Sequence, residues 1–449
     1  MKEKRYHKEK PFMKQFSVII IGGGARGWAY AKPMRGMPEK FKIVGVAEPD
    51  EHRRNDFKKN LNLPDEALFA SWEDILARPK MADIAVIATM DDMHYAPAMK
   101  AIELGYHLLL EKPVAQTEKE CTDIANFAKE RGVSVLVCHV LRYTPFFKKV
   151  KSIVESGKIG EIMSILHVEA VGDLHQTHSY IRGNWHSEKE TTPMLLAKSC
   201  HDLDIIQWLI DKPCKKVSSF GELTYFTEAN APEGAPVRCA DGTCPVADSC
   251  TYNALNVYYH DKNNQWFRSA ATRGIAKHNP PTDEEVMEAL KTTDYGLCVF
   301  RANNDVVDHQ VVNMQFEGGA TASFSMNAFN KGGRYIRIFG TKAEIYANMS
   351  DTTIHMYDFD TRRSQEIPVQ ETTEESIVGG HGGGDTGIVC DFYEYLAGTY
   401  TGSSIADIQT SVANHLIGFA AEEARHTDTV VDVDSFFEKH HYKNEYPKK

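Results

Sequence analysis

Three glycines stand at the spacing G-x-G-x-x-G, as Gly22, Gly24 and Gly27, directly after an apolar run at residues 16–21. Such a continuous run is typical of a buried parallel strand. Glycines at these positions let the backbone turn tightly and approach a pyrophosphate, whose charge is favoured by the free N–H groups of a helix N-terminus. The chemistry that this segment predicts is the binding of a dinucleotide.

An acidic residue lies at the distance that this motif requires. Glu48 ends a second apolar run at residues 43–47. A carboxylate there accepts hydrogen bonds from the adenosine ribose and repels a 2′-phosphate, so NAD is favoured over NADP. Arg53 and Arg54 follow closely and could soften that preference. An ordinary strand–helix–strand unit without a nucleotide is the alternative.

Two residues farther along could carry the reaction itself. Lys112 follows Glu111 at the end of an apolar strand, where its ammonium would lie beside a nicotinamide, and Pro113 stops that strand. His201 opens an amphipathic helix at 205–210. A histidine near an ammonium and a nicotinamide suits proton transfer with a substrate hydroxyl as a hydride moves. Taken singly, Lys112 also fits a surface lysine and His201 a helix-capping histidine.

The elements that must hold these residues alternate between apolar strands and amphipathic helices through residue 145. Further strands are expected at 83–89, 106–111 and 133–137, and a helix at 96–104 closed by Gly105. This alternation predicts an α/β fold with a doubly wound parallel sheet of Rossmann type, whose ligands lie beyond the C-terminal strand ends. The expected cofactor contacts are Gly22, Gly24, Ala25, Arg26, Gly27, Glu48, Thr89, His94, Glu111, Lys112 and Arg142.

Beyond residue 150 the pattern changes to strands with period-2 alternation. Apolar residues alternate at 312–316 and 320–326 on either side of a Gly-Gly turn, and further strands are expected at 335–339, 344–347 and 353–357. We expect a large, mostly antiparallel sheet with one face packed on helices and one face open. An open face of this kind is often used for oligomer contacts, which predicts a homodimer or homotetramer.

The chain is therefore expected to contain two domains and a tail. Residues 1–15 would form a basic disordered tail, 16–145 the dinucleotide-binding domain, and 146–449 a substrate and oligomerisation domain. A polar, loop-rich insertion that contains cysteines is expected at about 228–300.

Composition excludes several classes of protein. The 449 residues carry a formal net charge of −11, which argues against a nucleic-acid binder. No stretch approaches the ~20 apolar residues of a membrane span. No apolar core follows the basic leader as a signal peptide requires. We therefore expect a cytoplasmic protein whose partner is a small molecule.

Taken together, these motifs resemble the Gfo/Idh/MocA family of glucose–fructose oxidoreductase, inositol dehydrogenase and rhizopine-catabolism dehydrogenases. The resemblance covers nearly the whole chain and implies a Rossmann domain, an α/β domain with a large open sheet, and a nicotinamide cofactor. It implies a sugar, sugar-acid or cyclitol substrate, with Lys112 as the active-site lysine and His201 as the proton-transfer histidine. The motifs that carry it, in order, are the glycine loop, 47–50, 88–89 with His94, 111–113, 142–143 and 201–204. The expected substrate contacts are Lys112, Arg142, Tyr143, Trp185, Lys198, His201, Asp204 and His381.

The sequence departs from this family pattern just before His201. Dehydrogenases such as inositol dehydrogenase carry an aspartate four residues ahead of the catalytic histidine, whereas this chain has Ala197 there and Lys198 next to it. A carboxylate that would orient the substrate or tune the histidine is therefore absent. One hypothesis is that Lys198 meets a carboxylate or another anionic group of the substrate.

A glycine-dense segment at 379–385, with His381 inside it, precedes a helix that is expected to begin near Ile388. It resembles loops in family branches that include NAD-dependent glycoside hydrolases, which oxidise the sugar at C3, eliminate the aglycone, add water and reduce the ketone. A 3-keto group acidifies the neighbouring C–H, so modest bases suffice. Tyr180 and His178 are candidates for such bases, with simple packing as their alternative. For His381 a surface loop is the alternative.

Three functions remain open from the sequence. The first is an NAD-dependent oxidoreductase that moves a hydride between a nicotinamide and a sugar, sugar-acid or cyclitol carbon. The second is a glycoside hydrolase that recycles its NAD. The third is a non-catalytic NAD-binding sensor, since a fold alone does not establish chemistry.

A short loop contains Cys239, Cys244 and Cys250. Thiolates so close in a reducing compartment can bind a structural Zn²⁺ at about 2.3 Å, with a fourth ligand from elsewhere. Candidates for that ligand are Cys200, Cys214 and His260. The spacing matches no standard zinc ribbon, and an iron–sulfur cluster lacks its usual cysteine run. Isolated thiols are the alternative.

Overall fold

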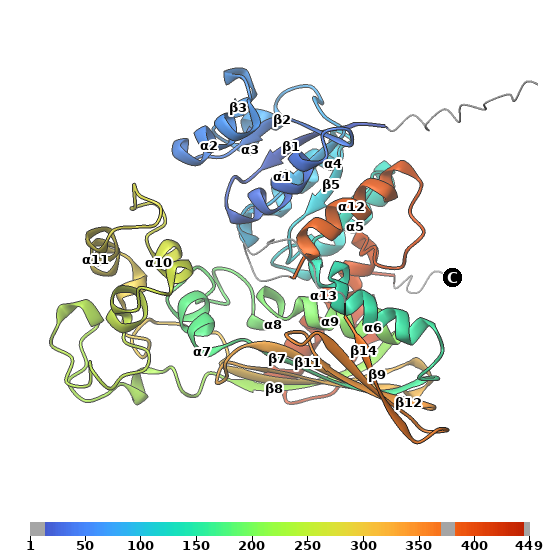
Figure 1. Cartoon of the computed structure of the whole chain (residues 1–449). Coiled ribbons are helices and arrows are strands. Elements are labelled where there is room, and N and C mark those ends of the chain that lie inside the picture. The colour runs from blue at the N-terminus through green and yellow to red at the C-terminus, as the bar shows by residue number, and fades with distance from the viewer. Residues whose placement is uncertain (1–13, 370–381, 444–449) are drawn as a thin grey trace, which may run out of the picture. The chain divides into compact units, whose positions relative to one another are not determined.

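The computed structural model describes residues 14–369 and 382–443 (Figure 1). These residues form two compact units. The first unit holds residues 14–114, 123–145 and 382–408, and the second holds 115–122, 146–369 and 409–443. Each unit has its own sheet and its own core.

The first unit is built on a parallel sheet of six strands in the order β3-β2-β1-β4-β5-β6. Its central strands are buried on both faces, as their unbroken apolar runs require. The expected Rossmann arrangement is confirmed. The strands are β1 Phe16–Ile21, β2 Phe41–Ala47, β3 Leu68–Phe69, β4 Ile84–Ile87, β5 His107–Leu110 and β6 Val135–Val137. The helices that connect them are α1 Ala25–Gly36, α2 Glu51–Leu61, α3 Trp72–Leu76, α4 Tyr95–Glu103 and α5 Glu118–Arg131.

Side chains at the helix starts fix where several of these helices begin. Asp50 accepts a hydrogen bond from the N–H of Arg53, and Ser71 accepts one from the N–H of Asp74, so both satisfy N–H groups that the first turn leaves open. At the other end of α4, Gly105 adopts a φ of 80°, a conformation that glycine takes at little cost.

A late segment of the chain completes the first unit, which differs from the expected continuous domain at 16–145. Helix α12 (Gly384–Ala397) packs Ile388 and Phe392 into the same core as β1 and β2, and the Tyr393 ring meets Phe16 edge-on at 5.8 Å. The helix begins at Gly384, earlier than the expected start near Ile388. Glycine is a poor helix former, which conceals this start in the sequence. A Cβ at Gly384 would lie 2.2 Å from the carbonyl oxygen of Val140, so the close packing requires glycine there.

The second unit is built on a sheet of nine strands in the order β14-β13-β12-β11-β7-β10-β9-β8-β15. Only β10 and β7 pair in parallel, so the sheet is mostly antiparallel, as expected. The expected hairpin is present, with Glu317–Gly319 joining β9 to β10. The strands are β7 Ile162–Ala170, β8 Cys214–Glu222, β9 His309–Phe316, β10 Thr321–Asn327, β11 Gly333–Gly340, β12 Ala343–Asn348, β13 Thr353–Asp358, β14 Arg363–Pro368 and β15 Val431–Asp432.

The two faces of this sheet differ in exposure. Along β9 the side chains of Val312, Met314 and Phe316 are buried, while Val311 and Asn313 between them are exposed. Figure 1 shows helices on one face of the sheet and none labelled on the other. The second unit therefore has the open sheet face that the alternation predicts. Its longer helices are α6 Pro145–Glu155, α9 Cys200–Ile210, α11 Asp283–Thr292 and α13 Ile408–Thr427, and shorter ones are α7 Asp173–His175, α8 Met194–Ala197, α10 Gln265–Ala271 and α14 Val433–Lys439.

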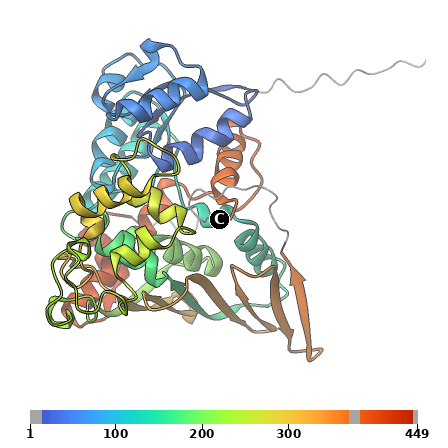
Figure 2. The ribbon, with the colours of Figure 1, turned by 60° about the vertical axis from the view of Figure 1, so that its left-hand side comes forward.

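Between β8 and β9 the chain leaves the sheet and forms short helices and loops with a small core of their own (Figure 2, green to yellow). Phe226, Tyr258, Val299 and Phe300 are buried in that core. Helix α11 starts with a reciprocal cap, in which Thr282 and Glu285 each accept a hydrogen bond from the other's backbone N–H. This segment contains residues 228–300, for which the sequence predicts a loop-rich insertion.

Among the described helices, none combines the length and the apolar composition that crossing a membrane requires.

Candidate functional site

The glycine loop has the geometry that a pyrophosphate needs. Gly22 has a φ of +95°, and a Cβ there would lie 2.4 Å from the carbonyl oxygen of Ala88. A Cβ at Gly27 would lie 2.1 Å from the carbonyl oxygen of Gly22, so helix α1 approaches the loop too closely for any side chain. At Gly24 a Cβ would meet nothing within 4 Å, which leaves an open side above the start of α1. The first turn of α1 carries no acidic residue, so its positive end is available to an anion.

The carboxylate of Glu48 lies directly beside this loop. It is 4% exposed and accepts hydrogen bonds from the N–H of Gly23 at 2.7 Å and of Asp50 at 2.9 Å. Arg54 donates to the carbonyl oxygen of Glu48, and an Nη1 of Arg53 lies 3.9 Å from its carboxylate. Both arginines are thus engaged around the backbone and carboxylate of Glu48. The residues present fit an adenosine ribose at the end of β2.

Arg26 joins the glycine loop to two buried carboxylates. Its Nε lies 2.5 Å from Oε1 of Glu111, and its Nη2 lies 2.7 Å from Oδ1 of Asp385. Tyr30 is fully buried and hydrogen-bonds both Arg26 and Glu111 at 2.5 Å. Burial raises the pKa of Glu111, but the charges of Arg26 and Lys112 outweigh it and hold that pKa below its usual value. Glu111 is therefore a carboxylate that holds Arg26 in place.

Glu111 also fixes the turn that carries Lys112. Its Oε2 accepts a hydrogen bond from the backbone N–H of Lys112 at 2.9 Å, and a cis peptide joins Lys112 to Pro113. His94 is fully buried under this turn, with Nδ1 2.7 Å from the carbonyl oxygen of Pro113 and Nε2 3.2 Å from that of Thr89. His94 therefore links the segments that follow the neighbouring strands β4 and β5, and it stabilises the turn between Lys112 and Pro113.

Arg142 and Tyr143 are both buried in the first unit. Nη1 of Arg142 donates to the carbonyl oxygen of Ile405 at 3.3 Å, and the hydroxyl of Tyr143 accepts from the N–H of Ala406. Both side chains thus hold the late segment that returns to this unit.

In the second unit, His201 lies in the first turn of α9, a helix whose residues are all buried. The next residue, Asp202, accepts from Nε2 of His167 at 2.7 Å and from Nε of Arg334 at 2.9 Å. Burial raises the pKa of Asp202, but Arg334 and His167 outweigh it and lower that pKa. Farther along the helix, Asp204 is fully buried and accepts from Asn414 of α13 at 2.6 Å.

Lys198 has a carboxylate partner inside the protein. Its Nζ lies 3.3 Å from Oε1 of Glu169, and Nε of Arg334 lies 2.6 Å from Oε2 of the same residue. With Asp202, the group contains two cations and two carboxylates, so their formal charges cancel. This compensation weakens the hypothesis that Lys198 awaits an anionic substrate group.

The two candidate bases lie in an aromatic cluster beside the π-helical turn at Gln176–Ile181. His178 is 4% exposed, stacks on Tyr295 at 4.7 Å between ring centroids, and has Nδ1 3.0 Å from the hydroxyl of Tyr258. Burial, with the charges of two arginines, lowers the pKa of His178 to about 3, so its imidazole stays neutral. Tyr180 is also buried, and its ring lies 6.1 Å from that of Trp185. His381 lies outside the described residues.

The loop cysteines lie at the edge of the small core. Cys239 is buried, whereas Cys244 and Cys250 are partly exposed. A fourth cysteine, Cys298, is distant in the sequence but lies in the same small core as Cys239. Its N–H donates to the carbonyl oxygen of Val237 at 2.8 Å, two residues before Cys239. A pairing of two distant chain segments leaves no signal in the spacing of one loop.

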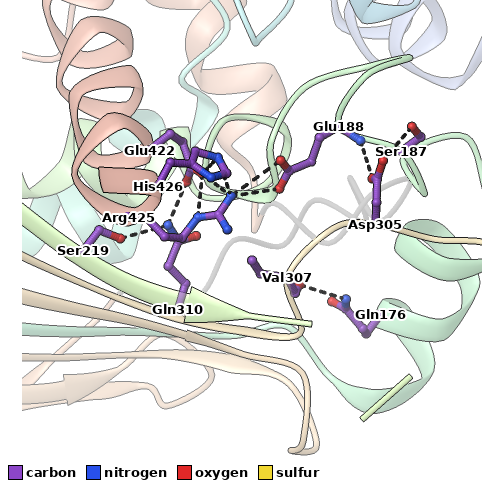
Figure 3. Close-up of polar contacts among 10 residues, drawn as sticks. All are labelled: Gln176, Ser187, Glu188, Ser219, Asp305, Val307, Gln310, Glu422, Arg425 and His426. Carbon is purple, nitrogen blue, oxygen red and sulfur yellow. Dashed lines mark hydrogen bonds and ion pairs between the residues drawn. The ribbon is translucent and has the colours of Figure 1, made fainter. Parts of the chain in front are cut away.

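A separate polar network ties the loop before α8 to α13 (Figure 3). Arg425 donates to Glu422 at 2.6 Å, to Glu188 at 3.2 Å and to Nε2 of His426 at 3.2 Å. Glu188, Glu422 and His426 are close enough to one another to be metal ligands, but Arg425 already supplies the positive charge among them. Burial, with Glu422 and Asp305, raises the pKa of Glu188 to about 7, although Arg425 opposes this.

The comparison with protein families covers both units. Residues 16–139 match the model described as "Oxidoreductase family, NAD-binding Rossmann fold", and residues 151–433 match "Oxidoreductase family, C-terminal alpha/beta domain". Both models carry the Gfo/Idh/MocA designation.

Individual relatives agree with this assignment. A putative oxidoreductase, YteT of Bacillus subtilis, is 25% identical over 86% of this chain and 92% of its own length. The 2,7-anhydro-N-acetylneuraminate hydratase of Escherichia coli is 27% identical over 45% of this chain and 51% of its own length. The levoglucosan dehydrogenase of Pseudarthrobacter phenanthrenivorans is 28% identical over 34% and 40%. This chain thus aligns with about half or less of the length of the latter two.

Solved structures share the fold. A levoglucosan dehydrogenase in complex with NADH and levoglucosan has a TM-score of 0.66 at 18% identity, over 94% of this chain and 100% of its own. An oxidoreductase from Agrobacterium radiobacter in complex with NAD⁺, L-tartaric acid and magnesium has a TM-score of 0.64 at 13% identity, over 94% and 99%. With its dinucleotide loop and both domains matched, the chain belongs to the Gfo/Idh/MocA family of NAD-binding oxidoreductases.

Proposed function

We propose that this enzyme transfers a hydride between NAD and a hydroxyl-bearing carbon of a sugar, sugar acid or cyclitol. The observation that carries the proposal is the glycine loop, where Gly22 and Gly27 admit no side chain and Gly24 leaves an open side. Levoglucosan dehydrogenase, whose solved complex holds NADH and a sugar derivative, supports the substrate class.

The residues divide the work of the oxidation between them. Nicotinamide, when bound, supplies the chemistry of accepting the hydride from the substrate carbon. His201 takes the proton of the substrate hydroxyl, and Lys112 polarises the oxygen that becomes the carbonyl. Asp202 is already engaged by His167 and Arg334, so it is a poor candidate for that proton. In the reverse direction, as the carbonyl carbon regains the hydride, Lys112 would stabilise the charge that develops on the oxygen and His201 would return the proton to it.

NAD is proposed over NADP because Glu48 is held beside the loop by two backbone N–H groups. A 2′-phosphate brought near this carboxylate would meet a like charge. One relative is nevertheless named as an NADP⁺-dependent scyllo-inositol 2-dehydrogenase, so cofactor choice varies among relatives.

A second candidate is a redox-neutral reaction in which NAD is reduced and reoxidised within one turnover, as in NAD-dependent glycoside hydrolysis. Ala197, at the position where family dehydrogenases carry an aspartate, favours it, as does the hydratase among the relatives. In that case the C–H neighbouring a transient ketone must be deprotonated, and Tyr180 is a candidate base. His178, held neutral by burial and bonded to Tyr258, is a weaker one.

One assay separates these functions. The full chain is incubated with NAD and a panel of sugars, sugar acids, cyclitols and aryl glycosides. Net NADH formation supports the dehydrogenase, and release of the aglycone without net NADH supports the redox-neutral reaction. Binding of NAD with neither reaction on the whole panel would favour the sensor and contradict the proposal.

We also propose that the open sheet face pairs two copies of the chain, giving a homodimer or homotetramer. Phe220, Tyr335 and Tyr346 are exposed there, and Tyr346 stacks on His355 at 4.6 Å beside a shallow depression of about 360 Å³. Light scattering on Tyr346→Glu would show smaller particles than the parent. Tyr395→Glu, on an exposed position of α12 in the first unit, is the matched control, and equal particle sizes for all three proteins would refute the pairing.

A cytoplasmic location is proposed from the cysteines. No disulfide joins any of the nine cysteines, all of which are among the described residues, and this fits a reducing compartment.

A further inference from the structure

We propose that four cysteines bind one thiophilic metal centre, and we expect its metal to be Zn²⁺. The ligands are Cys239, Cys244, Cys250 and Cys298. The centre would stabilise the segment between β8 and β9. The centre is independent of the proposed hydride transfer.

Two backbone contacts bring Cys298 to the cysteine loop. Arg238 and Leu297 form an antiparallel bridge, and the N–H of Cys298 donates to the carbonyl oxygen of Val237 at 2.8 Å. The Sγ of Cys239 lies 3.9 Å from the carbonyl oxygen of Leu297. Cys239 and Cys298 are 8% and 9% exposed and share one hydrophobic core. The two thiols are therefore packed on the same side of the bridge.

The remaining two cysteines lie on the same short loop as Cys239. Arg182 joins the end of that loop to the Cys298 segment, because it donates to the carbonyl oxygens of Tyr252 at 2.6 Å and of Leu297 at 2.7 Å. A binding metal ion would displace the protons of the four thiols, since the thiolate is the ligand.

A buried cation with no carboxylate partner lies beside them. Arg182 is 2% exposed, and Nε and Nη2 donate to the carbonyl oxygens of Leu297 at 2.7 Å and Tyr252 at 2.6 Å. Its Nη1 is buried without a hydrogen-bond partner. No described carboxylate forms an ion pair with Arg182, whose guanidinium carbon lies 5.9 Å from the centre of the Tyr258 ring.

The charges of a metal centre would complete this arrangement. A buried guanidinium is costly unless an anion pairs with it. Four thiolates around one Zn²⁺ carry a net charge of two minus, which would offer Arg182 the anionic partner that the described residues do not provide. Arg182 bonds the carbonyl oxygen of Leu297, which precedes Cys298, and that of Tyr252, two residues after Cys250. The metal and the arginine would therefore stabilise the same two chain segments.

The sulfurs must draw together to bind zinc. No three of them lie within 4.8 Å of one another. Tetrahedral zinc–sulfur bonds of about 2.3 Å place sulfurs about 3.8 Å apart. Gly242, between Cys239 and Cys244, has a φ of 73° with open space around it, so the loop has room to adjust. Iron and sulfide, which cysteines also bind in fours, would occupy the same ligands.

Metal analysis of the full chain purified under reducing conditions tests the proposal. We expect about one zinc per chain in the parent, about one in Cys214→Ser, and less than a tenth of that in Cys298→Ser. Cys214 is the matched control because it is buried on β8, outside the loop. Iron with acid-labile sulfide, together with a visible chromophore that dithionite bleaches, would support the four-cysteine centre. The centre would then be an iron–sulfur cluster and not a zinc ion.

A second measurement avoids variants that fail to fold. Cys244 and Cys250 of the parent protein are alkylated before and after chelator treatment, with Cys390 as a partly exposed reference in the first unit. We expect both loop thiols to be protected until the metal is removed. Metal-free protein whose loop thiols react as fast as Cys390 would overturn the proposal, as would a metal content that Cys298→Ser leaves unchanged.

Discussion

Arg26 of the glycine loop and Asp385 at the start of α12 form an ion pair, with 2.7 Å between Nη2 and Oδ1, although 359 positions separate them in the chain. Asp385 is nearly buried, and Arg26 simultaneously contacts Glu111, whose other oxygen holds the backbone of Lys112. The dinucleotide loop, the lysine turn and the late segment are thereby parts of one charged network within the first unit.

Removing the charge of Asp385 should loosen this network. Asp385→Asn leaves Arg26 with one carboxylate, so we expect the free energy of unfolding to fall by about 1–3 kcal/mol and the Kd for NAD to rise. Urea unfolding and nucleotide fluorescence titration measure the two effects. Glu394→Gln, exposed on the same helix, should stay within about 0.5 kcal/mol of the parent. Equal behaviour of both variants would show that the network does not support the loop.

Cofactor choice should depend on Glu48. Glu48→Gln keeps an oxygen for one of the two N–H groups, those of Gly23 and Asp50, that bond different oxygens of the carboxylate, and it removes the negative charge, with Arg53 still nearby. We expect the ratio of kcat/KM for NADP to that for NAD to rise about tenfold or more, because like charges brought together cost several kcal/mol. Steady-state kinetics with both cofactors measures it. An unchanged ratio in a variant with an unchanged melting temperature would contradict the assignment.

His201 should carry the proton. In His201→Asn we expect kcat to fall by about 10²–10⁴, with the affinity for NAD unchanged and one limb of the pH–rate profile lost. Ser199→Ala, two residues before it and without a capping hydrogen bond, is the control and should keep its activity. If His201→Asn kept both its kcat and its pH profile, the proton would have to travel by another residue.

Stability should depend on pH through Glu188. Its pKa is about 7 in the folded protein against an ordinary value of 4.5, so the folded state binds more protons between these pH values. By linkage, this residue's contribution to stability decreases as pH rises from the lower value to the higher. Glu188→Gln should therefore gain stability relative to the parent between about pH 5 and about pH 8, measured by urea unfolding. Glu190→Gln, exposed in the same loop, should show no such trend.

The sequence predicts most of the fold because its signals are local. The β-branched run at Phe16–Ile21 and the alternation through β9 each follow from a period that the chain itself carries. The glycine motif likewise predicts a tight turn from residues that are close together in the sequence. Lys112 and Glu48 lie at strand ends, so their places follow once the sheet is known.

The contacts that could not be predicted from the sequence are those between residues that are distant in the chain. Nothing near Lys198 indicates that Glu169 compensates its charge, and nothing near Cys250 points to Cys298. The aromatic surroundings that hold His178 neutral come from another segment, which carries Tyr258 and Tyr295. Such pairings are set by packing of the whole unit and leave no periodic signal.

The return of α12 to the first unit also bears on how the protein is made. Phe16 and Phe41 are synthesised long before Tyr393, against which they pack. Since domains usually fold as units in order of synthesis, the first unit must wait with an incomplete core while residues 146–369 of the second unit are made. During that interval the apolar surface that α12 later covers is exposed to other chains and to chaperones.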